Sequence, residues 1–208
     1  MNHPLEDHRA YFLQCFREGI GKARDSLDQF ATELLLELSS LKYPDYCYRL
    51  YRADIVGKRD GKNVIREITL GGRDVLAPPG VFPASVSFDA PVVWYGIEFV
   101  VAGSTIDEAR LIEWTTRWLD VTDSRYVESA EFQEVIHNVR PPKKTDAGFE
   151  ISVDFGTAPV AAFDELVQIL STTGKVSVGS FMTEDEKTEA QPGATDNPDD
   201  AQRLREDH

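Results

Sequence analysis

The sequence predicts a mixed α+β protein, and three patterns along its 208 residues support this fold class. Apolar side chains with helical spacing run through residues 11–41. A pattern typical of a β-hairpin follows in residues 46–70, and strand-like and helix-like segments alternate from residue 92 onward. We therefore expect a single domain over residues 1–182, followed by an acidic tail over residues 183–208.

Residues 1–42 predict a long N-terminal amphipathic helix. Its apolar stripe consists of Phe12, Phe16, Ile20, Ala23, Leu27, Phe30, Leu34, Leu38 and Leu41. Spacings of three and four place these side chains on one face of a helix. Gly19 and Gly21 interrupt the stripe, each at a cost of about 1 kcal/mol relative to alanine, so two helices with a bend near Gly19 remain an alternative. We expect the stripe to pack on the body of the domain; pairing with a second copy, as a homodimer, is the other option.

Residues 43–83 predict a hairpin and a loop. Aromatic and β-branched residues over 46–56 and 63–70 flank a turn that contains Asp60-Gly61, a pair typical of tight hairpin turns. Glycine and proline then dominate residues 71–83, which predicts a long surface loop, either functional or a plain connector.

Residues 84–182 predict four strands and two helices. The strands are expected at 92–101, 134–139, 149–155 and 175–181, and the helices at 104–119 and 157–174. This βαββαβ order resembles the ferredoxin-like fold. Because that fold hosts unrelated activities, the resemblance implies an architecture and no particular function.

The charge of the chain restricts its partners. The formal net charge is −14, and the segment after Thr183 carries nine acidic and three basic residues with no aromatic side chain. Such a composition predicts a disordered tail. An acidic protein repels nucleic acid and anionic membrane surfaces, so the expected partner is another protein, with a basic surface. The absence of a long apolar run or an export signal predicts a cytoplasmic protein.

Catalytic motifs do not emerge from the sequence. Gly19-Ile20-Gly21-Lys22 lacks the spacing and the hydroxyl residue of a phosphate-binding loop. The cysteines and the histidines are too scattered to form a zinc site by spacing. We therefore predict no catalytic residues, no bound metal and no cofactor.

The best candidate binding surface is one face of the predicted sheet. If Ile97, Phe99 and Val101 point toward the helices, the strand alternation places other side chains on the opposite face. The candidate binding residues there are Trp94, Glu98, His137, Asp154 and Lys175. Two alternatives stay open: the N-terminal helix or the hairpin covers this face, or Glu98, Asp154 and His137 hold a metal ion.

A second candidate surface is the basic hairpin. Residues 49–73 carry a local charge of +4, and the candidate interaction residues are Arg49, Arg52, Arg59 and Arg66. Neighbouring tyrosines give the hairpin a composition that nucleic-acid binders also use, although the net charge opposes that function. The alternatives are a solvated strand face and a salt-sensitive contact with the acidic tail.

These observations favour a non-enzymatic protein-interaction module, such as an adaptor or an immunity-like inhibitor of a basic partner. The acidic surface would speed the encounter with such a partner. The alternative is a small-molecule- or metal-binding sensor, or an enzyme, that uses the open face of the sheet.

Overall fold

The computed structural model of the chain describes residues 3–38, 40–68, 86–88, 92–125, 127 and 130–180. Over these residues the protein is a mixed α+β structure, as the sequence predicts, and its strands form two sheets. The predicted loop over residues 71–83 and the predicted tail over 183–208 lie outside the described residues. No helix within the described ranges has both the length and the apolar character needed to cross a membrane.

The elements follow in chain order. The helices are α1 (Glu6–Ser26), the short 3-10 helix η1 (Tyr46–Arg49), α2 (Glu108–Trp118) and α3 (Val160–Ser171). The strands are β1 (Gln29–Glu37), β2 (Leu50–Arg59), β3 (Lys62–Arg66), β4 (Val86–Phe88), β5 (Ile97–Ala102), β6 (Asn138–Val139), β7 (Lys143–Thr145), β8 (Gly148–Asp154) and β9 (Lys175–Ser180).

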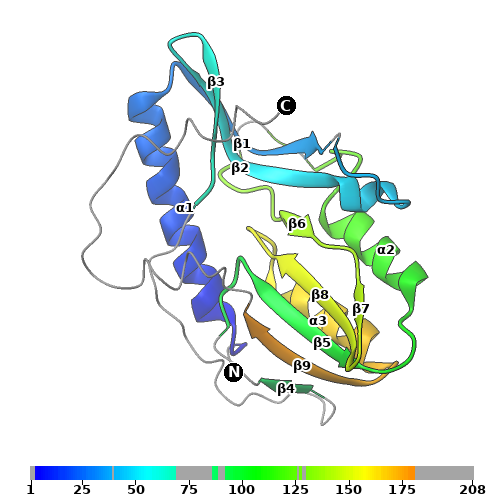
Figure 1. Cartoon of the computed structure of the whole chain (residues 1–208). Coiled ribbons are helices and arrows are strands. Elements are labelled where there is room, and N and C mark those ends of the chain that lie inside the picture. The colour runs from blue at the N-terminus through cyan, green and yellow to red at the C-terminus, as the bar shows by residue number, and fades with distance from the viewer. Residues whose placement is uncertain are drawn as a thin grey trace.

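The first sheet has the strand order β1-β2-β3, with both pairs antiparallel. Its β2–β3 hairpin confirms the predicted turn: Asp60 and Gly61 have φ angles of 52° and 74°. Two consecutive residues with positive φ are what a type I′ turn requires, and glycine adopts such angles without strain. The hairpin projects beyond the rest of the molecule (Figure 1).

The predicted helix over residues 11–41 is wrong in its second half. Helix α1 ends at Ser26, Leu27 adopts extended angles of −117° and 142°, and β1 follows. The spacing of Phe30 and Leu34 fits a helix as well as a strand. However, β1 forms eight residue pairs with β2, and these long-range hydrogen bonds outweigh the local pattern.

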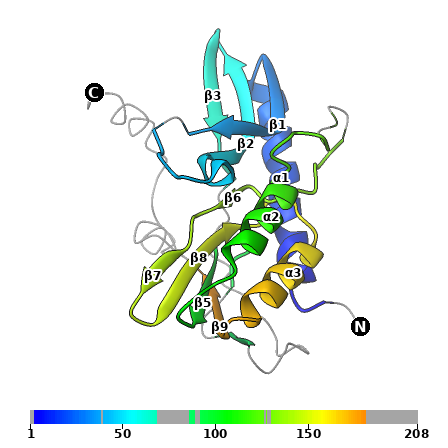
Figure 2. The ribbon, with the colours of Figure 1, turned by 90° about the vertical axis from the view of Figure 1, so that its right-hand side faces the viewer.

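The second sheet has the order β4-β9-β5-β8-β6, and β7 also pairs with β8. Strands β9, β5, β8 and β6 are antiparallel to their neighbours, whereas β4 is parallel to β9. Helices α2 and α3 lie side by side on one face of this sheet (Figures 1 and 2). We call the opposite face the outer face.

The predicted strand alternation on β5 and β8 is confirmed. Ile97 and Val153 are paired directly and buried beneath the helices, together with Phe99 and Val101. Glu98 is opposite Ser152 in the same register and belongs to the outer face.

Several predicted boundaries need correction. The strand expected to start at Val92 begins at Ile97, because Gly96 donates a hydrogen bond to the carbonyl of Val93 and closes a turn. The strand expected over residues 134–139 is reduced to β6, since Glu134 has a φ of 57° and interrupts the extended chain. Helix α2 is capped by Asp107, whose side chain accepts from the Arg110 amide, and not by the predicted Ser104 or Thr105.

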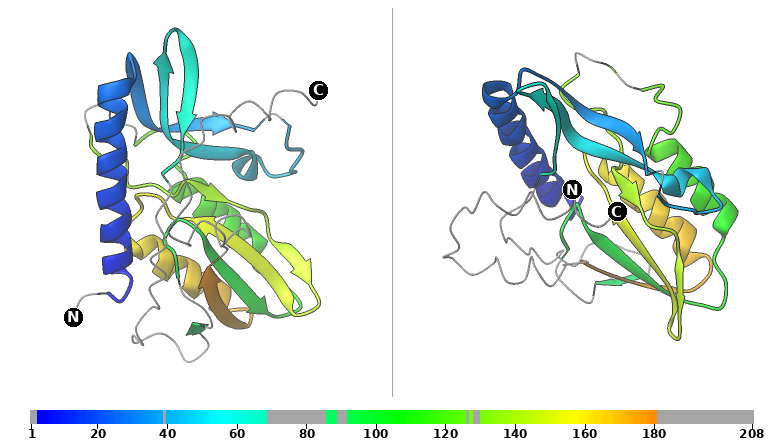
Figure 3. Two further views of the ribbon diagram at one scale, coloured as in Figure 1. Left: turned by 60° about the vertical axis from the view of Figure 1, so that its left-hand side comes forward. Right: turned by 45° about the horizontal axis from the view of Figure 1, so that its top comes forward.

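Helix α1 runs along both sheets and joins them (Figure 3). Leu5, Phe12 and Phe16 are buried in the main core, together with aromatic side chains of the second sheet and its helices. Ala23 packs in a smaller cluster with Leu27 and Ile55 of β2. The apolar stripe of α1 is therefore used within the chain itself.

Candidate functional site

His137 lies in the interior, between the two sheets, and not on the outer face. It immediately precedes β6, and its side chain is 2% exposed. Its Nε2 is 2.9 Å from Oε1 of Glu33 on β1, and its Nδ1 is 2.7 Å from Oδ1 of Asp54 on β2. The ring packs against Phe12 and Phe16 of α1. We call His137, Glu33, Asp54, Asp154 and Thr157 the His137 cluster.

Backbone geometry brings this cluster together. Glu33 has a φ of 52°, which interrupts β1 directly opposite Asp54, so both carboxylates reach the same imidazole. The second carboxylate oxygen of Glu33 accepts from the Gln133 amide at 2.6 Å, and Thr157 donates its hydroxyl to the first. Gly156 allows the close approach of the ring, since a Cβ there would lie 2.1 Å from Cδ2 of His137.

The cluster holds more acidic groups than basic ones. Burial alone would lower the pKa of His137, but Asp54 and Glu33 raise it well above its usual value. Burial and the nearby carboxylates of Asp54 and Glu67 raise the pKa of Asp154 to about 7, against the opposing effect of His137. Desolvation and Asp54 likewise raise the pKa of Glu67 to about 7. The raised pKa of His137 favours its protonated form, which contacts Glu33 and Asp54 of the first sheet and lies near Asp154 of the second.

This geometry favours a structural role for the cluster. Glu33 is 0% exposed and Asp54 is 4% exposed, so a substrate would have to displace packed side chains to reach them. A buried charge pair of this kind is costly to break because each partner would remain desolvated. Within the described residues, no three side chains of metal-ligating type are arranged to hold a metal ion.

The five predicted binding residues do not form one surface. Trp94 is buried in the turn before β5, where its ring packs at a tilt against Phe155 and its indole N–H donates to the carbonyl of Gly156, so its predicted outward position is wrong. His137 is in the interior. Asp154 lies at the end of β8, next to His137. Lys175 is exposed at the opposite end of the sheet, paired in register with Ala102.

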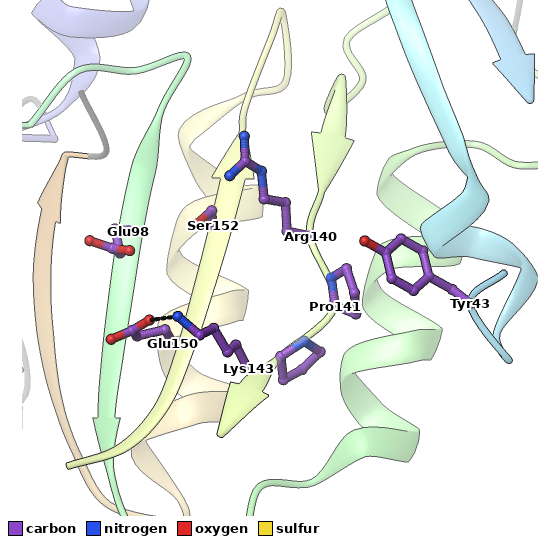
Figure 4. Close-up of a pocket in the computed structure, with 8 residues that line it drawn as sticks. Tyr43, Glu98, Arg140, Pro141, Lys143, Glu150 and Ser152 are labelled. Carbon is purple, nitrogen blue, oxygen red and sulfur yellow. Dashed lines mark ion pairs between the residues drawn. The ribbon is translucent and has the colours of Figure 1, made fainter. Parts of the chain in front are cut away.

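Glu98 remains on the outer face, where it lines a pocket of about 430 Å³. The residues of this outer-face pocket are Tyr43, Glu98, Arg140, Pro141, Pro142, Lys143, Glu150 and Ser152. Figure 4 shows Glu98 at one side and Tyr43 at the other, with the chain from Arg140 to Lys143 between them. Lys143 forms an ion pair with Glu150 at 3.6 Å.

The four predicted hairpin arginines have different environments. Arg52 is 1% exposed, and it donates to the carbonyls of Glu33, Leu119 and Asp120. Its predicted role on the surface is therefore wrong. The buried guanidinium instead connects β2 to the segment after α2 through these hydrogen bonds.

The other three arginines lie nearer the surface. Arg49 is close to Glu37 and stacks on Tyr46, and Arg66 donates to the hydroxyl of Ser26. Arg59, at the end of β2, is exposed.

Sequence reasoning missed Glu33 and Asp54. Glu33 stands within the apolar run of residues 30–36, and Asp54 is flanked by Ala53 and Ile55. A carboxylate inside an apolar segment is a signal for a buried pair, since such a group needs a partner. Assigning residues 27–41 to a helix hid this signal at Glu33. Tyr43 and Arg140, in contrast, carry no signal that the sequence alone could supply.

Comparisons of the chain with protein-family models, with curated proteins and with solved structures found no match. The candidate function therefore depends on the geometry of the described residues.

Proposed function

We propose that the protein is a non-enzymatic interaction module that binds another protein through its outer face. One observation carries this proposal: helices cover one face of the six-stranded sheet, whereas the opposite face carries a shallow pocket with charged, aromatic and proline side chains. Antiparallel sheets commonly pack one face on the core and leave the other available.

The environments of the His137 cluster and of the outer-face pocket support binding over catalysis. The groups best suited to acid–base chemistry, His137 with Glu33 and Asp54, are enclosed and paired to each other. The outer-face pocket instead combines tyrosine and proline rings with charged side chains at the surface. Aromatic residues and arginine are enriched at protein interfaces, and charged residues are typical of their rim. The acidic net charge of −14 favours a partner with a basic surface.

Differential capture from a lysate tests this proposal. Immobilised wild-type protein is compared with Ser152→Trp, which fills the pocket, and with Glu113→Trp, a control on the exposed surface of α2. We expect at least one protein to bind the wild type and the control at low salt and to be lost from Ser152→Trp. Identical captured sets for all three proteins would rule out the outer face as the interaction surface.

The pocket volume favours a second candidate function, the binding of a small molecule. A volume of about 430 Å³ lies within the range of roughly 300–1,000 Å³ typical of small-molecule sites. A thermal-shift screen against metabolites and divalent metals separates the two functions. A ligand that raises the melting temperature of the wild type but not that of Glu98→Gln would favour a sensor or an enzyme.

We also propose that β5 to β9 form a ferredoxin-like unit. The antiparallel order β9-β5-β8-β6, with α2 between β5 and β6 and α3 between β8 and β9, supports this assignment. Strand β4 and the short strand β7 are additions to that pattern.

A further inference from the structure

The surroundings of Glu98 leave space above its carboxylate. Glu98 is on β5, between two neighbouring strands, and its direct neighbours in the register are Ser152 on β8 and Gly179 on β9. Neither neighbour has a side chain long enough to cover it. The carboxylate therefore lies in a hollow whose floor is formed by small residues.

The charges around this hollow leave the Glu98 carboxylate without a counter-ion from the described residues. Two basic residues, Arg140 and Lys143, line the same pocket. Lys143 is close to Glu150, at 3.6 Å, and neither of these two described basic residues forms an ion pair with Glu98. No ion pair or hydrogen bond to the Glu98 side chain occurs within the described part of the chain. A half-buried carboxylate gains most from a charged donor that brings its own hydrogen bonds.

The other side of the pocket is formed by ring side chains. Tyr43 and Pro141 provide ring surfaces on the side away from Glu98 (Figure 4), and Pro142 also lines the pocket. Aromatic surfaces bind apolar side chains at protein interfaces at a low cost in conformational entropy. The pocket thus has the Glu98 carboxylate at one end and ring side chains at the other, with Arg140, Lys143 and Glu150 between them (Figure 4).

From this arrangement we infer that the outer-face pocket binds a segment of a protein partner that places an arginine side chain on Glu98 and an apolar side chain against Tyr43 and Pro141. Arginine fits better than lysine because its planar guanidinium binds a carboxylate through two parallel hydrogen bonds. This inference rests on the proposed interaction function and specifies the chemistry of its partner.

Peptide selection followed by affinity measurement tests the inference. Wild-type protein selects from a displayed library of random 12-residue peptides. The best peptides are then synthesised, and their Kd is measured for the wild type, for Glu98→Gln and for Glu113→Gln, the same change on the exposed surface of α2. A version of each peptide with citrulline, the neutral analogue of arginine, completes the set.

We expect the selected peptides to share an arginine next to an apolar residue. Both Glu98→Gln and the citrulline peptide should weaken binding about tenfold or more, which corresponds to about 1.4 kcal/mol. Glu113→Gln should stay within twofold. Circular dichroism and the unfolding midpoint confirm that the variants fold.

Two results would overturn the inference. Selected peptides without an arginine preference, or an unchanged Kd for Glu98→Gln, would remove the arginine site but leave an interaction function on the outer face. If no peptide binds and the capture experiment also finds no difference between wild type and Ser152→Trp, both the inference and the proposed function fail.

Discussion

The His137 cluster and the outer-face pocket both contain carboxylates, yet they differ in what surrounds them. In the His137 cluster, Glu33 accepts hydrogen bonds from an imidazole, a hydroxyl and a backbone amide in the interior. In the outer-face pocket, Glu98 is half-buried and has small neighbours on both sides. The paired charges of the His137 cluster are buried between the two sheets, where they stabilise the fold, whereas Glu98 is the carboxylate that we propose a partner contacts.

The largest expected effect comes from removing the imidazole. His137→Leu leaves two buried carboxylates facing an apolar side chain, and removing one partner of a buried pair costs about 3–5 kcal/mol. Urea unfolding measures this loss. His3→Leu, which removes a partly exposed histidine from its pair with Asp164, serves as the control and should cost much less. Equal losses for the two variants would contradict the structural role of His137.

The next largest expected effect distinguishes Arg52 from Arg59, two arginines of β2 that the sequence analysis assigns the same role. Arg52→Gln deprives three backbone carbonyls of a charged donor, so we expect a loss of about 2–4 kcal/mol in the free energy of unfolding. Arg59→Gln, at an exposed position of the same strand, should change stability by less than ~0.5 kcal/mol. A similar stability for both variants would mean that the guanidinium of Arg52 is dispensable.

The pH dependence of stability should also reflect the His137 cluster. The pKa of Asp154 and that of Glu67 are raised to about 7, so the folded state binds more protons than the unfolded state between about pH 4 and 7. The raised pKa of His137 acts in the same direction: its stabilising effect is complete below about pH 6.5 and is lost as the pH rises through the folded-state value.

Unfolding free energies are therefore expected to decrease from pH 5 to pH 8. Asp154→Asn should flatten this slope, because the amide cannot ionise, whereas Glu98→Gln should leave it unchanged. Denaturant titrations at four or five pH values provide the measurement. Stability that rises over this interval would contradict the proton balance of the cluster.

The smallest expected effect concerns the exposed ion pair of the outer-face pocket. Lys143 is mostly exposed, and pairs of this kind contribute about 0–1 kcal/mol. Lys143→Ala should therefore shift stability by less than ~0.5 kcal/mol, and added salt should remove the difference. A loss of unfolding free energy comparable to that of Arg52→Gln would mean that the Lys143–Glu150 pair stabilises the fold as the buried charges do.

The sequence predicts the second half of the fold better than the first. The alternation of Ile97, Phe99 and Val101 correctly indicates which face of β5 is buried, because a strand with one covered face has a strict two-residue period. Residues 29–37 follow a spacing compatible with a helix, and only the pairing with β2 makes them a strand. Long-range hydrogen bonding of this kind has no local signature.

The candidate site was only partly predictable for the same reason. Glu98 is correctly assigned to the outer face, since its position depends only on the alternation along β5. His137 is buried against Glu33 and Asp54, which belong to the other sheet. The alternation along a single strand does not predict such a contact. The contribution of Tyr43 to the outer-face pocket likewise depends on how a loop folds back over the sheet edge, which the sequence does not encode locally.

The most direct test of the difference between the two regions is the same substitution made in each. Glu33→Gln and Glu98→Gln are compared by urea unfolding at pH 7. We expect Glu33→Gln to lose about 3 kcal/mol or more, because the neutral amide no longer matches the imidazolium, and Glu98→Gln to change by less than ~0.5 kcal/mol. Equal losses would contradict the distinction between a structural buried cluster and an outer-face carboxylate available to a partner.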